Sequence, residues 1–227
     1  MLSQEEMKRV AGEYAVQLIQ PGFVTGIGTG STVYYFIQAL AKKVKEGLNI
    51  KATVTSQKSA SLAREAGITI TDLNDVDTID IAIDGADEAD SHLQLIKGGG
   101  GALLQEKMVA AASRKLVIIV DSDKLVNQLG KFPLPVEVIP YGWKQTQKHI
   151  AGLSGHKIVL REQEGNPFVT DHGHYILDCH FEKIENPSQL SEQLNAIPGV
   201  VENGLFINMA SAIIIGRPDG TIQTITK

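Results

Sequence analysis

Two spacings of apolar residues alternate along the first half of the chain. Apolar runs of strand length lie at 23–27, 50–54, 68–70, 79–83 and 116–120. Around and between them, apolar residues recur every three or four positions, the spacing of one helix face, over 3–19, 33–44, 55–67 and 103–112. Buried strands that alternate with helices predict a parallel sheet covered on both faces.

The pattern changes at Lys131–Pro140, where prolines flank an alternating strand. The order downstream is strand, helix, two strands, helix and strand, a ferredoxin-like arrangement, over 134–139, 142–153, 157–161, 174–179, a helix from 187, and 199–202. Two last strands, 212–215 and 221–225, are predicted to rejoin the first sheet. We therefore predict an α/β protein with a Rossmann-like parallel-sheet main domain, residues 1–131 and 205–227, and an inserted, smaller ferredoxin-like α+β domain, residues 132–204.

Composition and net charge limit the kinds of partner and the cellular compartment that this chain can have. The 227 residues are 43% hydrophobic, enough for a full core, and carry a net charge of −5. Without a run of Lys and Arg, this charge argues against nucleic acid or an anionic membrane as the main partner. No apolar run reaches the length of a membrane span, and the first residues lack the pattern of a secretory signal. With the single cysteine, Cys179, these features predict a cytoplasmic protein.

Three polar segments come directly after predicted strands, where α/β folds bind small molecules. The first, Gly26–Thr32, is close to a dinucleotide fingerprint, but Ser31 stands where the third glycine belongs, and no acidic residue follows the strand that ends at Val54. Its amides and hydroxyls at a helix start suit a phosphate instead, through Thr29, Gly30, Ser31 and Thr32. A glycine turn with an ordinary Ser/Thr cap is the alternative.

The other two segments carry charged side chains. Asp84, Asp87, Glu88 and Asp90 crowd one strand end, and the third segment has Lys97, four glycines and Glu106. Neighbouring carboxylates can share a proton, bind a metal or hold sugar hydroxyls, and glycine amides can line an oxyanion site. Taken singly, these residues are more often a solvated acidic turn, a surface lysine, and a glutamate paired with Lys107. Their combination favours proton transfer on a phosphorylated substrate, with Glu106 as the base.

The histidines do not indicate a metal site. None forms a helical pair, and His172 and His174 have the spacing of a hairpin turn without a carboxylate partner. We predict no bound metal, and we assign Cys179 and Trp143 to packing.

Several long motifs follow one another in order along the sequence: Gly28–Thr32, Asp84–Glu88, Lys97–Gly100 with Glu106, Asp121 with Lys124, Gly130–Pro140, Asn195–Val201, Gly204–Phe206 and Pro218–Gly220. Through these motifs, nearly the whole chain resembles the type A ribose-5-phosphate isomerases. The resemblance implies a cofactor-free aldose–ketose isomerase that interconverts ribose 5-phosphate and ribulose 5-phosphate in the pentose phosphate pathway. It also implies a homodimer or homotetramer.

By position, the resemblance implies that Glu106 moves a proton between C2 and C1 of the open-chain sugar through an enediolate. Lys97 and the amides of Gly98, Gly99 and Gly100 would stabilise the negative charge. Asp84 would open the ring or orient hydroxyls, and Asp87, beside Gly85 and Ala86, would position the reacting oxygens. The Thr29–Thr32 loop would hold the phosphate, with Lys124 and Lys8 as further cations.

One departure and one weak region qualify the resemblance. Gly101 stands where relatives often have alanine, and we expect it only to loosen the loop slightly. Residues 141–186 match the family less distinctively, and no proposed catalytic residue lies among them.

Three other functions compete with this one. A different phosphosugar enzyme, such as a deaminase or lactonase, could share the phosphate loop and the base but would lack the combination of Lys97, glycines and Glu106. A non-catalytic sugar-phosphate sensor would need an attached DNA-binding module, which these 227 residues do not include. A phosphatase would use the acidic cluster to hold a metal, and EDTA would inhibit it.

Overall fold

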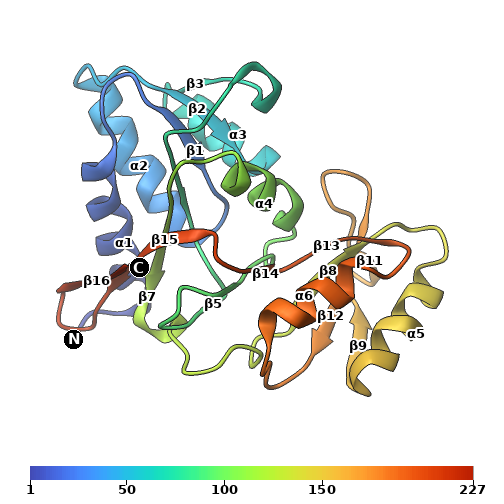
Figure 1. Cartoon of the computed structure of the whole chain (residues 1–227). Helices are drawn as coiled ribbons and strands as arrows, with labels where there is room; N and C mark the ends of the chain where they lie inside the picture. Colours follow the sequence, from blue (N-terminus) through green and yellow to red (C-terminus); the bar gives the residue numbers. More distant parts are fainter. Residues whose placement is uncertain (227) are drawn as a thin grey trace.

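A seven-stranded sheet forms the centre of the larger domain in the computed structural model, which describes residues 1–226 (Figure 1). Its strands are β1 (Val24–Ile27), β2 (Lys51–Val54), β3 (Thr69–Ile70), β4 (Ile81–Asp84), β7 (Leu116–Asp121), β15 (Ala210–Gly216) and β16 (Ile222–Thr226). Their order is β16-β15-β7-β4-β1-β2-β3, and only β16 runs antiparallel to its neighbour. The predicted α/β class is confirmed, and the last two strands rejoin the first sheet as expected.

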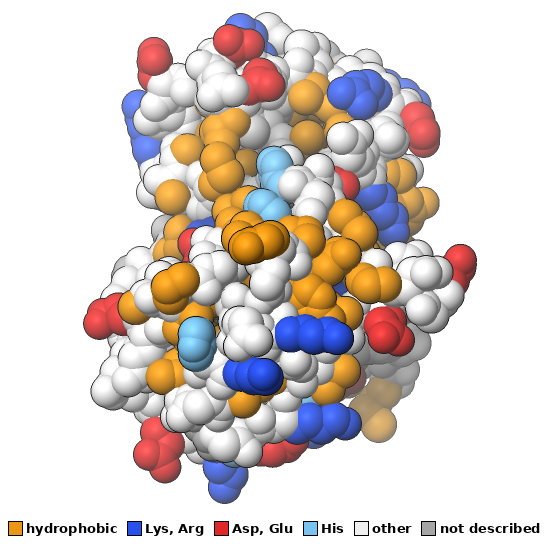
Figure 2. All heavy atoms as spheres, turned by 90° about the vertical axis from the view of Figure 1, so that its right-hand side faces the viewer, with side chains coloured by type: hydrophobic (Ala, Val, Ile, Leu, Met, Phe, Trp, Pro, Cys, Tyr) orange, Lys and Arg blue, Asp and Glu red, His pale blue; other side chains and the backbone are white. Residues whose placement is uncertain are grey.

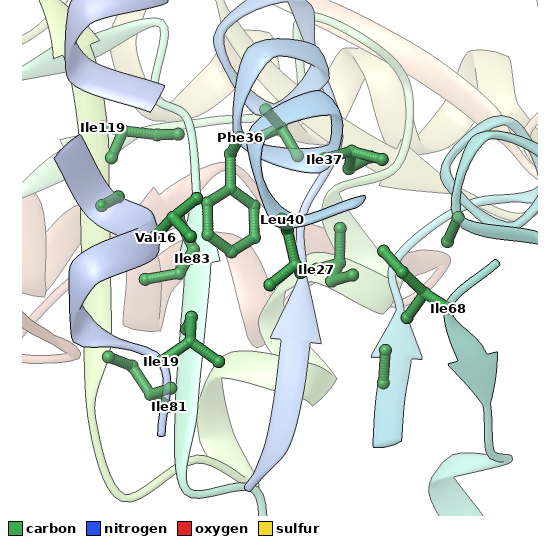
Figure 3. Packing of buried hydrophobic residues seen from close by; sticks show 14 of the residues in the cluster. Val16, Ile19, Ile27, Phe36, Ile37, Leu40, Ile68, Ile81, Ile83 and Ile119 are labelled. Carbon is green, nitrogen blue, oxygen red and sulfur yellow. The ribbon is translucent and has the colours of Figure 1, made fainter. Parts of the chain in front are cut away.

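Successive apolar side chains of the strands point to opposite faces of this sheet, so a hydrophobic core forms on each face. On one face, Val117 and Ile119 of β7 pack against helices α1 (Gln4–Ala15), α2 (Ser31–Lys45) and α3 (Gln57–Glu65). Figure 3 shows Phe36, Ile37 and Leu40 of α2 pointing into this core toward Ile27 and Ile83. On the other face, Ile118 and Val120 pack with α4 (Leu103–Ala111).

A short three-stranded sheet completes the second face. It consists of β5 (Glu88–Ala89), β6 (Leu95–Ile96) and β14 (Leu205–Phe206), in the order β14-β6-β5. The sequence pattern did not predict it, because two-residue strands are too short to show a period. These strands also reach the smaller domain, since Ile96 and Leu205 pack into its core.

The smaller domain has the predicted ferredoxin-like order. It comprises β8 (Leu134–Val138), α5 (Trp143–Ser154), β9 (Lys157–Leu160), β12 (Tyr175–His180), α6 (Pro187–Asn195) and β13 (Val200–Asn203). The sheet order is β13-β8-β12-β9, with antiparallel neighbours, and Cys179 is buried in its core. A small hairpin of β10 (Glu162–Gln163) and β11 (Asn166–Pro167), which was not predicted, lies between β9 and β12.

The surface is mixed in character. On the face shown in Figure 2, acidic and basic side chains are interspersed with apolar ones. Within residues 1–226, no helix is long and apolar enough to cross a membrane.

Candidate active site

A cavity of about 130 Å³ lies where the loops after β1, β4 and β6 meet the first turns of α2 and α4. Carboxyl ends of neighbouring parallel strands share one edge of a sheet, which brings these loops together. All the predicted site residues line the cavity except Asp84, which is buried beside it. The lining residues are Lys8, Thr29, Gly30, Ser31, Thr32, Gly85, Ala86, Asp87, Lys97, Gly98, Gly99, Gly100, Glu106 and Lys124.

Asp84 ties the loops after β1 and β4 to each other. Its Oδ1 accepts hydrogen bonds from the backbone N–H groups of Thr29, at 3.1 Å, and Gly85, at 2.7 Å. This approach requires the neighbouring glycine, because a Cβ at Gly28 would lie 1.9 Å from Asp84 Oδ1. Gly28 is therefore a structural part of the site, a role that its place in the glycine motif did not reveal.

Lys97 joins two carboxylates in the interior. Its Nζ lies 3.0 Å from Asp84 Oδ2 and 3.3 Å from Glu106 Oε2, and it donates a hydrogen bond to the carbonyl of Gly85. Lys97 is 2% exposed and Glu106 4% exposed, which excludes the surface alternatives for both residues. The neighbouring Lys107 instead pairs with Glu202, at 2.8 Å, in the smaller domain.

One ammonium cannot neutralise two buried carboxylates, so this cluster favours taking up a proton. Asp84 has three donors, whereas Glu106 Oε2 has no hydrogen-bond partner within residues 1–226. Burial raises the pKa of Glu106 to about 8, against the opposing effect of the Lys97 ammonium. Burial alone would lower the pKa of Lys97, but the carboxylates of Asp84 and Glu106 outweigh it and raise that pKa. Burial also raises the pKa of Asp84, against the opposing effects of the Lys97 ammonium and the backbone donors, so the extra proton belongs to the pair of carboxylates.

The glycine loop, residues 98–101, presents backbone groups on both of its sides. The Gly99 N–H donates to Asp87 Oδ2 at 2.7 Å, and a Cβ at Gly99 would lie 2.5 Å from Asp87 Oδ1. Gly101 has a φ of +81°, and a Cβ there would lie 2.4 Å from Cζ of Phe168. The expectation that Gly101 only loosens the loop is therefore wrong, because both its backbone and the Phe168 ring require a glycine.

The opposite end of the cavity is formed by the start of α2. Gly30, with a φ of +127°, precedes α2, which begins without a side-chain cap. Within residues 1–226, the first amides of α2 are therefore left without a hydrogen-bonded cap where Ser31 and Thr32 line the cavity. Lys8 of α1 and Lys124, in the turn after β7, add two ammonium groups. The Thr29 hydroxyl is engaged elsewhere, with Thr55 at 2.7 Å and Ser56 at 2.8 Å. It therefore forms the wall of the site, whereas the sequence predicted a phosphate donor.

The histidine pair differs from its prediction in one respect. Nδ1 of His174 lies 2.9 Å from Oε1 of the buried Glu137, so His174 does have a carboxylate partner. Glu137 is 37 residues away in the sequence, which hides the pair from local pattern analysis. Within residues 1–226, no group of three or more His, Cys, Asp or Glu side chains is arranged to hold a metal ion.

Sequence analysis missed one residue beside the site. Arg161, which follows β9 in the smaller domain, donates from Nη1 to the carbonyls of Gly98, at 2.9 Å, and Gly99, at 3.1 Å. The local sequence gives no sign of this contact, because it joins segments more than 60 residues apart.

The chain is similar to a well-defined group of proteins. The family model for ribose 5-phosphate isomerase A (phosphoriboisomerase A) matches residues 51–220. Ribose-5-phosphate isomerase A of Bacillus mycoides is 52% identical over 94% of this chain and 97% of its own length. The protein of the same name from Bacillus anthracis is 54% identical over 95% of this chain and 98% of its own length.

Solved structures agree with these sequence matches. A D-ribose-5-phosphate isomerase in complex with phospho-erythronic acid superposes with a TM-score of 0.96 and 40% identity, over 100% of both chains. Ribose 5 phosphate isomerase A from Neisseria gonorrhoeae superposes with a TM-score of 0.93 and 41% identity, over 100% of this chain and 98% of that one.

Proposed function

The chain belongs to the ribose 5-phosphate isomerase A family, and from this premise we propose how its cavity performs an aldose–ketose isomerisation. The protein is an isomerase that interconverts ribose 5-phosphate and ribulose 5-phosphate. The reaction exchanges a hydrogen on C2 for one on C1, while a proton passes between the two oxygens, so the sugar is neither oxidised nor reduced overall. It belongs to the non-oxidative branch of the pentose phosphate pathway.

Glu106 is the base in this proposal, and the observation that carries it is the buried contact of Glu106 with Lys97 at the cavity wall. The ionised carboxylate takes the C2 proton of the open-chain aldose and returns a proton to C1. A carboxylate with a pKa near 8 is a stronger base than one in water, and Glu106 lines the cavity. The proton lies next to a carbonyl, so its removal places negative charge on oxygen.

The other charged residues divide between positioning and contact. All the contacts of Asp84 are with the two loops and Lys97, and it does not line the cavity, which supports a positioning role in place of ring opening. Asp87 lines the cavity and holds the Gly99 amide, which supports contact with the reacting oxygens. Lys97 pairs with Asp84 and, with the glycine amides, stabilises the enediolate.

The start of α2 receives the phosphate in this proposal. Free amides at the beginning of a 15-residue helix, with Lys8 and Lys124 nearby, provide donors and positive charge for a dianion. Binding there would hold the sugar with its C1 and C2 end toward Glu106.

A proton NMR time course in D₂O tests the function directly. EDTA-treated protein is mixed with ribose 5-phosphate, and ribulose 5-phosphate formation and deuterium incorporation are followed. We expect ketose to appear with deuterium at the migrating position, because the base exchanges its proton with solvent. No conversion by folded protein would favour the sensor or another phosphosugar reaction, and activity lost with EDTA would favour metal-dependent chemistry.

Three further features are part of the proposal. We propose a cytoplasmic homodimer or homotetramer, in which residues 132–204 form the inserted domain. The lone Cys179, which is buried and unpaired, suits a reducing compartment. The ferredoxin-like sheet lies wholly within the proposed insertion. Sedimentation velocity on the purified chain would decide its oligomeric state, and a single species at the monomer mass of 24.5 kDa would contradict assembly.

A further inference from the structure

Within residues 1–226, Arg161 is the only side chain of the smaller domain that donates hydrogen bonds to carbonyls of the glycine loop. Its Nη1 bonds both Gly98 O and Gly99 O, while Nε and Nη2 form a fork with the Asp178 carboxylate at 2.9 and 2.5 Å. The Arg161 and Asp178 side chains are 15% and 21% exposed. The guanidinium also lies 5.9 Å from the centre of the Phe168 ring, which covers Gly101. The arginine is thus held on several sides before it reaches the loop.

In a planar trans peptide the C=O and the N–H point in opposite directions, so a contact that fixes the carbonyl also fixes the direction of the amide. In the peptide between Gly98 and Gly99, the C=O accepts from Arg161 and the N–H donates the opposite way, to Asp87 Oδ2. In the next peptide, Gly99 C=O also accepts from Arg161, so the Gly100 N–H is turned away from the smaller domain. Asp87 lines the cavity on that side.

The Gly100 N–H is available to a ligand. It donates to no group within residues 1–226, although Gly100 lines the cavity and is exposed. Glycine peptides rotate with little steric resistance, so the amides in a run of four glycines keep one direction only where other groups hold them. The Gly98 carbonyl also accepts from the Gly101 N–H at 3.0 Å, whereas within residues 1–226 only Arg161 donates to the Gly99 carbonyl, which shares a peptide with the Gly100 N–H.

We propose that Arg161 is a positioning residue of the isomerase reaction: it fixes the Gly98 and Gly99 carbonyls and so aims the Gly100 amide at the oxygens that become negative in the enediolate. The proposal rests on the proposed function, because it assumes that the glycine amides stabilise that charge. Arginine suits this role because its rigid fork can hold Asp178 and two carbonyls at once, whereas a lysine ammonium has no such fixed geometry.

The test compares Arg161→Gln with wild type in turnover and in the binding of two probes. Arg161→Gln should lower kcat by about 10- to 100-fold, because the Gly100 amide is no longer aimed at the developing negative charge. It should change KM by less than about threefold. Phospho-erythronic acid carries a carboxylate as well as a phosphate, so its affinity should fall. Inorganic phosphate should bind as in wild type, because it needs only the α2 end of the cavity.

Three further variants provide a control and two independent tests of the role of Arg161. Arg114→Gln removes an arginine with a 71% exposed side chain that pairs with Asp80, and it should match wild type. Arg161→Lys should not restore kcat, and Asp178→Asn, which removes one of the two acceptors that hold the guanidinium, should lower kcat by a smaller factor. If Arg161→Gln does not fold, these two variants give the same test through kcat and phosphate affinity.

Three results would overturn the proposal. They are an unchanged kcat in the Arg161 variants, full rescue by lysine, and an equal loss of affinity for both probes, which would indicate general disorder of the site. Glu106→Gln in the same assay separates this proposal from the proposed function. If Glu106→Gln is fully active, the enediolate mechanism fails; if it is inactive while Arg161→Gln is normal, only the role of Arg161 fails.

Discussion

The two ends of the cavity differ in how they hold charge. At one end, Asp84, Lys97 and Glu106 are 3%, 2% and 4% exposed, and each of the two carboxylates lies within ion-pair distance of the Lys97 ammonium. At the other end, Ser31, Lys8 and Lys124 remain partly or fully exposed to solvent. Charges interact strongly in a buried, low-dielectric setting and weakly where water screens them. The buried end can therefore alter proton affinity, whereas the open end can bind and release a dianion.

The largest expected effect is at the buried end, where Glu106→Gln removes the base. We expect kcat to fall by about 10²- to 10⁴-fold, with phosphosugar affinity nearly unchanged, because general bases contribute in that range. Steady-state kinetics and isothermal titration with ribose 5-phosphate measure the two quantities. Turnover equal to that of wild type would remove Glu106 from the mechanism.

The same substitution should raise stability at alkaline pH. The folded pKa of Glu106 is about 8, above its ordinary value of 4.5, so the folded state binds more protons between these values. Its contribution to stability therefore declines as pH rises through that window. Glutamine has no such dependence, and avoiding a poorly partnered buried charge is worth about 1–3 kcal/mol, or roughly 2–4 °C of Tm per kcal/mol. Thermal melts at pH 6 and pH 9 measure this effect, and an equal shift at both values would contradict it.

The pH profile of the wild-type enzyme gives a separate measurement of the buried end. Since the base acts when ionised, kcat/KM should rise with pH by about tenfold per unit below a pKa near 8 and level off above it. The substrate phosphate titrates near ~6, so points above pH 7 isolate the enzyme group. A profile that is flat from pH 7 to pH 9 would show that Glu106 is ionised in the free enzyme, contrary to the charge argument for the cluster.

Substitution at the open end should act on binding instead. Lys124→Ala or Thr32→Ala should raise KM on the order of tenfold, which corresponds to about 1.4 kcal/mol, and leave kcat close to wild type. Lys43→Ala is a matched control, because Lys43 pairs with Glu46 on the surface at the far end of α2. A loss confined to kcat would mean that the two ends are not separate in function.

The smallest expected effect concerns the glycine loop, which contacts the smaller domain through Arg161 and Phe168. Gly101→Ala should reduce the free energy of unfolding by about 1–3 kcal/mol, because the methyl group meets Phe168 and the residue has a positive φ. Adding Phe168→Ala should recover the steric part but not the backbone part. Urea unfolding of the two single variants and the double variant measures the coupling, and strictly additive effects would show that the ring does not restrict Gly101.

Much of this molecule was determined by local sequence. The alternation of apolar runs with helical spacing gave the α/β class, and the order of elements after Lys131 gave the ferredoxin-like sheet. The cavity could also be anticipated, because polar residues that follow parallel strands such as β1 and β4 must meet at one edge of the sheet. These inferences need only periodicity and the geometry of neighbouring strands.

Other features were decided only by tertiary structure, because they depend on pairs of residues that are distant in sequence. A sequence pattern does not reveal that Lys97 and Glu106 are buried, that Asp84 is held behind the cavity wall, or that Glu137 meets His174. It also does not show Arg161 of the smaller domain bonding the glycine loop. Burial and desolvation, which set the pKa of Glu106, come into existence only when the two domains and their loops pack together.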